Sequence, residues 1–259
     1  MRPIWTGALG FGLVNIPVRL YGATDESTIP FVSLDKHDHA RIRYKKVNEK
    51  TGKEVAFHDI VKGYEMGKEI VIVDEEDIRK ATPEKYDHLS IVQFVKEKEI
   101  DARYYEKPYY LAPDKGGDRA YILLRDALAK EGKVAIGPLV FHKREWICLV
   151  KPLDKVLVLH RLRFPEEIRD TNSLTIPDAP IKDAEMKMAI SLISQLTQPF
   201  KPEEFKDDFS AKLLKVIEAK AKGKGATIKQ MKATTSTTTI DLMEKLKESL
   251  KTPARKKAS

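Results

Sequence analysis

The sequence has little cysteine and no long apolar run. Among its 259 residues there is a single cysteine, Cys148. One cysteine cannot form an internal disulfide or a cysteine zinc site, so the composition favours a reducing, cytoplasmic setting. No apolar run reaches the ~20 residues that a membrane helix needs. The first residues also lack the charged, apolar and small-residue regions of a secretion signal. We therefore expect a cytoplasmic protein without a membrane partner.

Common catalytic motifs are missing as well. The sequence contains no G-x-S-x-G, H-E-x-x-H or Walker loop. The early glycines do not follow the dinucleotide-binding order, and glycines inside a strand more often mark a bend or a close backbone approach. Cys148 stands in a strand-like run with no basic group beside it, which indicates a buried, inert thiol. The polar cluster near residue 37 matches no standard metal-ligand spacing and reads better as a turn; its members are Asp35, His37, Asp38, His39 and His58.

The positive charge is concentrated at the C-terminal end. The net charge is +8, but residues 211–259 hold thirteen basic and four acidic residues, a net of +9. Residues 1–210 then hold 34 basic and 35 acidic residues, a net of −1. Such a basic end predicts an arm that binds a polyanion, and a solvated tail that promotes solubility is the alternative.

Most of residues 4–164 read as strands, with one helix that begins near Asp118 and ends near Gly132. Many strands with a single inserted helix favour a barrel or a strongly curved sheet. Two amphipathic helices follow at 184–198 and 202–222, and they could pack on the β body or reach a partner chain. A short helix is expected at 240–250. The predicted strands are Ile70–Val73, Leu89–Val95, Tyr104–Leu111, Val134–Phe141, Trp146–Val150 and Lys155–Phe164.

The segment from Arg41 to Val47 alternates basic and apolar residues. On a strand, Arg41, Arg43 and Lys45 would share one face at a spacing of ~6.6 Å. Such a row suits a phosphate backbone, although a solvated strand face has the same pattern. A second basic pair, Lys143 and Arg144, lies between two predicted strands.

Three stretches of this sequence resemble the prokaryotic Ku family of DNA-end-binding proteins. They are the opening I-W-T-G with F-G-L-V-N-I-P-V-R-L-Y (residues 4–21), R-I-R-Y-K-K-V with T-G-K-E-V (residues 41–55), and I-D-L-M-E-K-L (residues 240–246). The resemblance covers essentially the whole chain. In one respect this chain departs from it: some members carry a cysteine pair in the turn at 46–53, where this chain has Asn48, so we expect no metal there.

The resemblance implies a mainly β fold with some α: a Ku-type β-barrel core with an extended bridge (1–180), a helical dimerisation arm (181–222) and a flexible basic tail (223–259). It implies a homodimeric ring without enzymatic activity or cofactor. The ring would hold double-stranded DNA ends, close to the nucleoid, without reading sequence. The tail would recruit an end-joining DNA ligase of the ligase D type through Ile240, Leu242, Met243, Leu246 and Leu250. The DNA-binding candidates are Arg19, Arg41, Arg43, Lys45, Lys46, Lys96, Lys98, Lys143 and Arg144.

Two rival functions remain open at this stage. A metal-dependent nuclease would use Asp74, Glu75 and Asp77 with nearby histidines. These acids also fit the start of a short helix, where carboxylates interact favourably with the helix dipole. A general nucleic-acid-coating protein would bind through its basic tail alone.

Overall fold

A computed structural model describes residues 1–25, 28–81, 88–142 and 144–223, together with Met243, Leu246, Lys247 and Leu250. The chain divides into two compact units, Met1–Thr171 and Asn172–Ser259, and each is described by itself. Within the described ranges, no helix has the length and apolar character needed to span a membrane.

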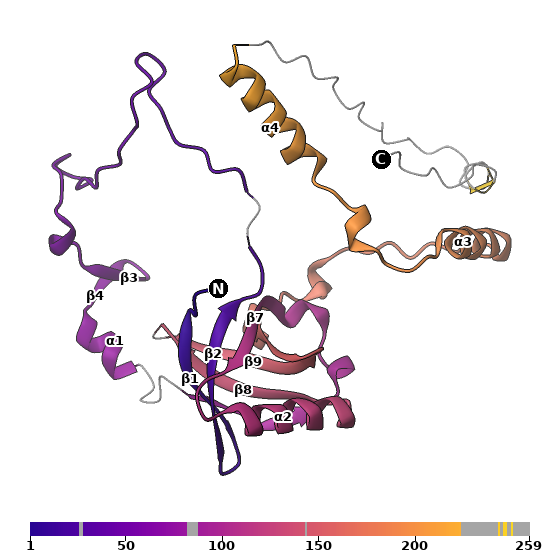
Figure 1. Ribbon diagram of the computed structural model, residues 1–259. Coiled ribbons are helices and arrows are strands. Elements are labelled where there is room, and N and C mark those ends of the chain that lie inside the picture. Colours follow the sequence, from indigo (N-terminus) through magenta and orange to yellow (C-terminus); the bar gives the residue numbers. More distant parts are fainter. Residues whose placement is uncertain are drawn as a thin grey trace. The chain divides into compact units, whose positions relative to one another are not determined.

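A closed β-barrel is the centre of the first unit (Figure 1). Its strands are β1 (Trp5–Phe11), β2 (Val14–Gly22), β5 (His88–Ser90), β7 (Tyr105–Pro113), β8 (Val134–Phe141), β9 (Arg144–Leu153) and β10 (Val156–Leu162). They follow one another around the barrel in the order β5-β1-β2-β7-β10-β9-β8. Leu89 of β5 pairs with Leu139 of β8 and closes the circle. A further short strand, β6 (Gln93–Val95), pairs with β8. The predicted barrel is confirmed.

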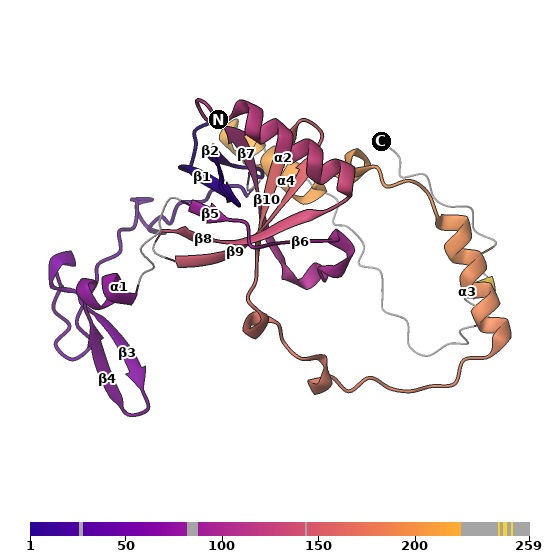
Figure 2. The ribbon, with the colours of Figure 1, turned by 90° about the horizontal axis from the view of Figure 1, so that it is seen from below.

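The helix α2 (Asp118–Glu131) packs along the barrel (Figure 2). Tyr121, Leu124 and Leu128 are its buried residues, and they share one face because they are spaced three and four positions apart. The Tyr121 hydroxyl donates to the Leu111 carbonyl at 2.6 Å and accepts from the Leu157 amide at 2.7 Å. One buried hydroxyl therefore ties the helix to β7 and β10. The helix begins one residue earlier than an N-cap at Asp118 would place it, since Gly117 is its N-cap.

Two glycines allow the short strand β5 to close the barrel. A Cβ atom at Gly137 would stand 1.9 Å from the Ser90 carbonyl oxygen. On the opposite edge of β5, a Cβ atom at Gly10 would stand 2.2 Å from Nε2 of His88. Real Cβ atoms do not approach so closely. At Gly10 the close neighbour is thus a side chain, that of His88, and not the backbone that a strand glycine was expected to admit.

Residues 28–81 leave the barrel after β2 and return at β5, and we call them the extended segment (Figure 1). They include β3 (Lys62–Met66), β4 (Glu69–Val73) and α1 (Glu75–Ala81), and β3 and β4 form a separate two-stranded sheet. Large apolar side chains are exposed there, among them Tyr64 at 66% and Ile72 at 64%. The extended segment thus has little core of its own.

The second unit contains α3 (Asp183–Leu196) and α4 (Asp208–Ala221). The single helix predicted at 202–222 is wrong, because a 3-10 turn (Pro202–Glu204) precedes a separate α4. Asp207 causes the new start: its side chain accepts a hydrogen bond from the Ser210 amide at 3.0 Å and so caps the helix. Both helices expose apolar side chains, which are Met186, Ile190, Ile193 and Leu196 on α3 and Phe209, Leu214 and Ile217 on α4.

Candidate nucleic-acid interface

Charge is divided along the extended segment. Residues 40–53 contain six basic residues and one acid, whereas residues 54–81 contain four basic and eight acidic residues. The net charge therefore changes from +5 to −4 within one continuous stretch. We call residues 40–53 the basic segment.

The basic segment does not form the regular strand that the sequence predicts. Arg41 pairs with Leu34 and Val47 pairs with Glu54, each in an isolated bridge, and residues 42–46 have no strand neighbour. Single backbone bonds support the two ends, from the Ile42 amide to the Ser33 carbonyl at 3.0 Å and from the Val55 amide to the Lys46 carbonyl at 2.9 Å. Alternation alone predicted the strand, but a strand also needs a partner along its length.

The turn before the basic segment uses the polar cluster for backbone bonds. The Asp35 carboxylate accepts from the His37 amide at 2.7 Å, and the Asp38 carboxylate accepts from the Ala40 amide at 2.8 Å. The Asp35 amide in turn donates to the Ala40 carbonyl at 2.8 Å. The interpretation as a polar turn is confirmed for residues 35–40, whereas His58 belongs to a separate 3-10 turn (Phe57–Asp59).

Asn48 organises the turn within the basic segment. Its side-chain oxygen accepts from the Lys50 amide at 2.9 Å and from the Thr51 amide at 3.1 Å. Gly52 takes a φ of +67°, which a residue with a side chain rarely adopts. An asparagine-centred turn thus organises the loop that carries Lys50 and Lys53.

The cations of the basic segment differ in what surrounds them, although all are exposed. Lys45 Nζ lies 2.6 Å from Glu54 Oε2. Lys46 Nζ lies 5.3 Å from the centroid of the Phe57 ring, a cation–π distance. Arg41 and Arg43 make no ion pair with any residue that the structure describes. Their guanidinium groups could therefore contact a phosphate without first displacing an acid of the described residues.

The other DNA-binding candidates belong to the barrel and its loops. Arg19 on β2 contacts Asp114, with Nη2 2.7 Å from Oδ1. This pair raises the pKa of Arg19, and the pKa of Asp114 is lowered by the Lys115 backbone amide and by Arg19. Lys96, Lys98 and Arg144 are exposed. Lys143 lies outside the described residues. A DNA-binding role for these five stays a prediction.

The tail candidates are described only in part. Met243, Leu246 and Leu250 are helical and partly buried. Ile240 and Leu242 lie outside the described residues. Ligase recruitment through these five therefore remains a prediction.

The acidic run at 74–77 caps a helix. The Asp74 carboxylate accepts from the amides of Glu76 and Asp77, both at 2.8 Å, and Asp77 accepts from the Asp74 amide at 3.1 Å. The Asp77 amide is the main reason that the pKa of Asp74 is lowered. The interpretation of these acids as the opening of a short helix is confirmed, although α1 begins at Glu75 and not at the predicted Asp77. Across the described ranges, no group of three or more His, Cys, Asp or Glu could hold a metal ion.

Cys148 is the buried thiol that the sequence indicates. It is 0% exposed, and burial raises the pKa of its thiol to about 12. The thiolate required of a nucleophile is therefore not formed at neutral pH.

Sequence reasoning did not select Lys50, Lys53 or Glu54 as parts of the site. Their signal is local: Lys50 and Lys53 flank the Asn48 turn, and Glu54 follows directly, where an acid can reach back to Lys45. These three residues become visible when the Asn48 turn is considered together with the residues on both of its sides, rather than the alternating row alone.

Comparison with known proteins matches this chain to one family. Residues 10–188 match the family Ku, described as the Ku70/Ku80 beta-barrel domain. The chain is similar to the non-homologous end joining protein Ku of Coxiella burnetii, with 40% identity over 96% of this chain and 94% of that protein. It is 39% identical to the protein of the same name from Pseudomonas aeruginosa, over 98% of this chain and 89% of the relative. The one from Bacillus subtilis is 35% identical, over 96% and 82%.

Proposed function

The chain belongs to the Ku family, and we propose that it is a non-enzymatic homodimeric ring that binds the ends of linear double-stranded DNA in non-homologous end joining. The relatives that share its full length are named for that repair pathway. The barrel common to the family is the part of this chain with a closed, well-packed core.

The basic segment is the observation that carries this proposal. Its cations extend into solvent from a loop outside the barrel, and Arg41 and Arg43 have no acidic partner in the described part of the chain. Extended cations without a shaped pocket suit sugar–phosphate contacts and do not read base edges. Binding should therefore be indifferent to sequence and should weaken steeply with salt, because it releases counterions from the DNA.

Exposed apolar surface supports the homodimer. The stripes on α3 and α4 and the apolar residues of the extended segment are too numerous for one soluble chain to leave uncovered. A second copy of the chain would cover both. This agrees with a dimer in which two extended segments enclose the duplex and the helical units hold the copies together.

Ligase recruitment is proposed for the tail. Met243, Leu246 and Leu250 are spaced three and four residues apart, as in a helix that docks in an apolar groove. Deletion of residues 234–259 should leave DNA-end binding intact and abolish stimulation of an end-joining ligase of the ligase D type. A variant with Lys256 and Lys257 changed to Ala controls for loss of charge and should still stimulate. Full stimulation by the truncated protein would disprove the assignment.

The proposal contains no catalytic step. The carboxylates of Asp74 and Asp77, which a nuclease would need, are engaged with backbone amides of their own helix. A coating protein that binds through its tail alone would leave the basic segment without a role.

Binding to linear and to closed DNA tests the proposal. We expect tight binding to a linear duplex and weak binding to a nicked circle of the same length and sequence. A circle of equal affinity would contradict end binding. Metal-dependent cleavage that is lost on changing Asp74 would restore the nuclease.

A further inference from the structure

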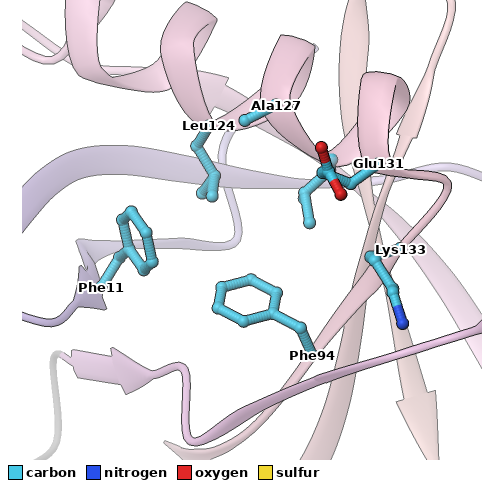
Figure 3. Close-up of a pocket in the computed structure, with 7 residues that line it drawn as sticks. Phe11, Phe94, Leu124, Ala127, Glu131 and Lys133 are labelled. Atoms are coloured by element: carbon cyan, nitrogen blue, oxygen red, sulfur yellow. The ribbon is translucent and has the colours of Figure 1, made fainter.

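An apolar pocket lies where one end of the barrel meets α2. Its volume is about 250 Å³, and it is lined by Phe11, Phe94, Leu124, Ala127, Leu128, Glu131 and Lys133. Phe11 and Phe94 pack edge to face, with ring centroids 5.5 Å apart. Figure 3 shows the two rings facing the side chains of α2, with Glu131 and Lys133 on the side away from Phe11. Apolar cavities of ~150 Å³ hold a benzene molecule, so this pocket has room for a leucine side chain.

A fully exposed leucine stands next to this pocket. Leu13 lies in the turn between β1 and β2, two residues from Phe11, and its relative exposure is 107%. Its neighbour Gly12 has a φ of +59°, a conformation that glycine adopts readily in a tight turn. The turn is short, since β1 and β2 pair as far as Phe11 and Val14 on either side of Gly12 and Leu13.

From these two features we infer that the pocket receives Leu13 of a second copy of this chain, reciprocally. The protruding side chain is two residues along the chain from Phe11, which lines the pocket, so one copy carries both halves of a self-complementary contact. A two-fold axis between them places each Leu13 in the pocket of the other copy. The contact buries two leucines against four aromatic rings, and the rings come from residues that are already partly exposed, Phe11 at 38% and Phe94 at 41%.

The surroundings of the pocket favour a second copy over an unrelated peptide. Glu131 and Lys133 have opposite charges and lie on the same side of the pocket. In a two-fold contact, each can approach its counterpart of opposite sign from the other copy, so the charges complement one another without a partner of special composition. The chain itself also provides the apolar side chain that would fill the pocket, which is Leu13.

The consequence of this contact depends on the proposed function, although the contact does not. Two leucines make a weak interface by themselves, well below the area of a stable complex. Rings threaded on one duplex would be held at a high effective concentration, and a weak contact then suffices to join neighbours. Each homodimer would carry two such barrel ends, so several rings could associate in a row.

Site-specific cross-linking tests the contact directly, because the sole native cysteine is buried and does not compete. Two full-length variants, Leu13→Cys and Ala127→Cys, are made with tags of different size and mixed with and without linear DNA. We expect a disulfide between positions 13 and 127, and more of it with DNA. Leu123→Cys is the matched control, since Leu123 is an exposed residue of α2 that does not line the pocket. Equal cross-linking to positions 127 and 123 would overturn the inference.

Sedimentation provides the second measurement. Leu13→Ser should weaken association beyond the dimer by about a hundredfold, because two buried leucines are lost from each contact. Ala127→Trp should do the same by filling the pocket from the exposed surface of α2. Leu123→Ser should have no effect. Unchanged association of Leu13→Ser overturns the inference. DNA-end binding of the same proteins is measured in parallel. If the wild-type protein does not bind DNA ends, the proposed function is overturned instead.

Discussion

The ammonium group of Lys45 lies 2.6 Å from the carboxylate of Glu54, across the Asn48 turn of the basic segment. The positive charge of Lys45 is thus balanced by a carboxylate of its own chain, while Arg41 and Arg43 have no acidic partner among the described residues. The cations of one short segment are therefore not equivalent. Glu54 limits what the segment can contribute to binding a polyanion.

Replacing Glu54 with Gln should strengthen DNA binding. Lys45 becomes available to a phosphate, and we expect about two- to fivefold tighter binding, since an exposed ion pair contributes at most about 1 kcal/mol. Glu49→Gln is the matched control, because it removes the same charge from the same turn without releasing Lys45. Fluorescence anisotropy on a short duplex measures both. Equal gains in the two variants would mean that overall charge, and not Lys45, is responsible.

Loss of the two unpaired arginines should weaken binding in a salt-dependent manner. Arg41→Gln with Arg43→Gln should lower the slope of log K against log salt by about 2, as expected for two phosphate contacts. Lys68→Gln, in the turn between β3 and β4, should leave the slope unchanged. The side chains of Arg41 and Arg43 are both exposed, so the double substitution should not change the temperature of thermal unfolding. An unaltered salt slope would place the DNA contacts elsewhere.

Gly137 should be essential for closing the barrel. In Gly137→Ala, the new methyl group would meet the Ser90 carbonyl oxygen, a backbone atom that cannot move aside. We expect a loss of about 2 kcal/mol or more in the free energy of unfolding, measured with urea. Gly10→Ala should cost less, because the nearest atoms there belong to the His88 side chain. A larger loss for Gly10→Ala would contradict this account of the seam.

Stability should fall in acid below about pH 4. The pKa of Asp114 is lowered from its usual value of 3.8, first by the Lys115 amide and then by Arg19. The pKa of Asp74 is lowered by its helix-capping bonds, and the pKa of Asp207 is lowered first by the Ser210 hydroxyl and then by the Ser210 amide. A carboxylate with a lowered folded pKa stabilises the fold above pH 3.8, and this is lost as pH falls through the folded value.

Thermal melts from pH 6 to pH 2 check this dependence. Asp114→Asn should reduce the melting temperature at pH 6 and show a smaller further decrease in acid. Arg19→Gln should have an intermediate effect, because the Lys115 amide still binds Asp114. An Asp114→Asn variant with the full acid dependence of the wild type would show that this carboxylate is not involved.

The barrel was predictable because its strands are apolar, β-branched runs bounded by turn residues. Runs such as Val134–Phe141 coincide with strand β8. The closure of the barrel could not be predicted, because it depends on β5. This strand has three residues, which pair in parallel with β1 and meet β8 at one point. The sequence predicts one strand at Leu89–Val95, whereas the structure divides this stretch into β5 and β6. The break before α4 was missed for a different reason: one capping bond from Asp207 decided it against a continuous apolar stripe.

The candidate site was predictable only as a group of residue types. Alternation drew attention to Arg41, Arg43 and Lys45, but it could not show that Lys45 has a partner and that the arginines have none among the described residues. Arg19 illustrates the same limit. Its partner Asp114 is 95 residues away, and only the pairing of β2 with β7 brings the two together.

The central claim is that the protein encloses DNA, and trapping on a circle tests this most directly. The protein is loaded on a linear duplex, the ends are joined by an added ligase, and the circle is washed with salt high enough to remove the protein from linear DNA. We predict that the protein stays on the circle and is released when a restriction enzyme cuts it. Equal release from uncut circle and linear duplex would contradict a closed ring.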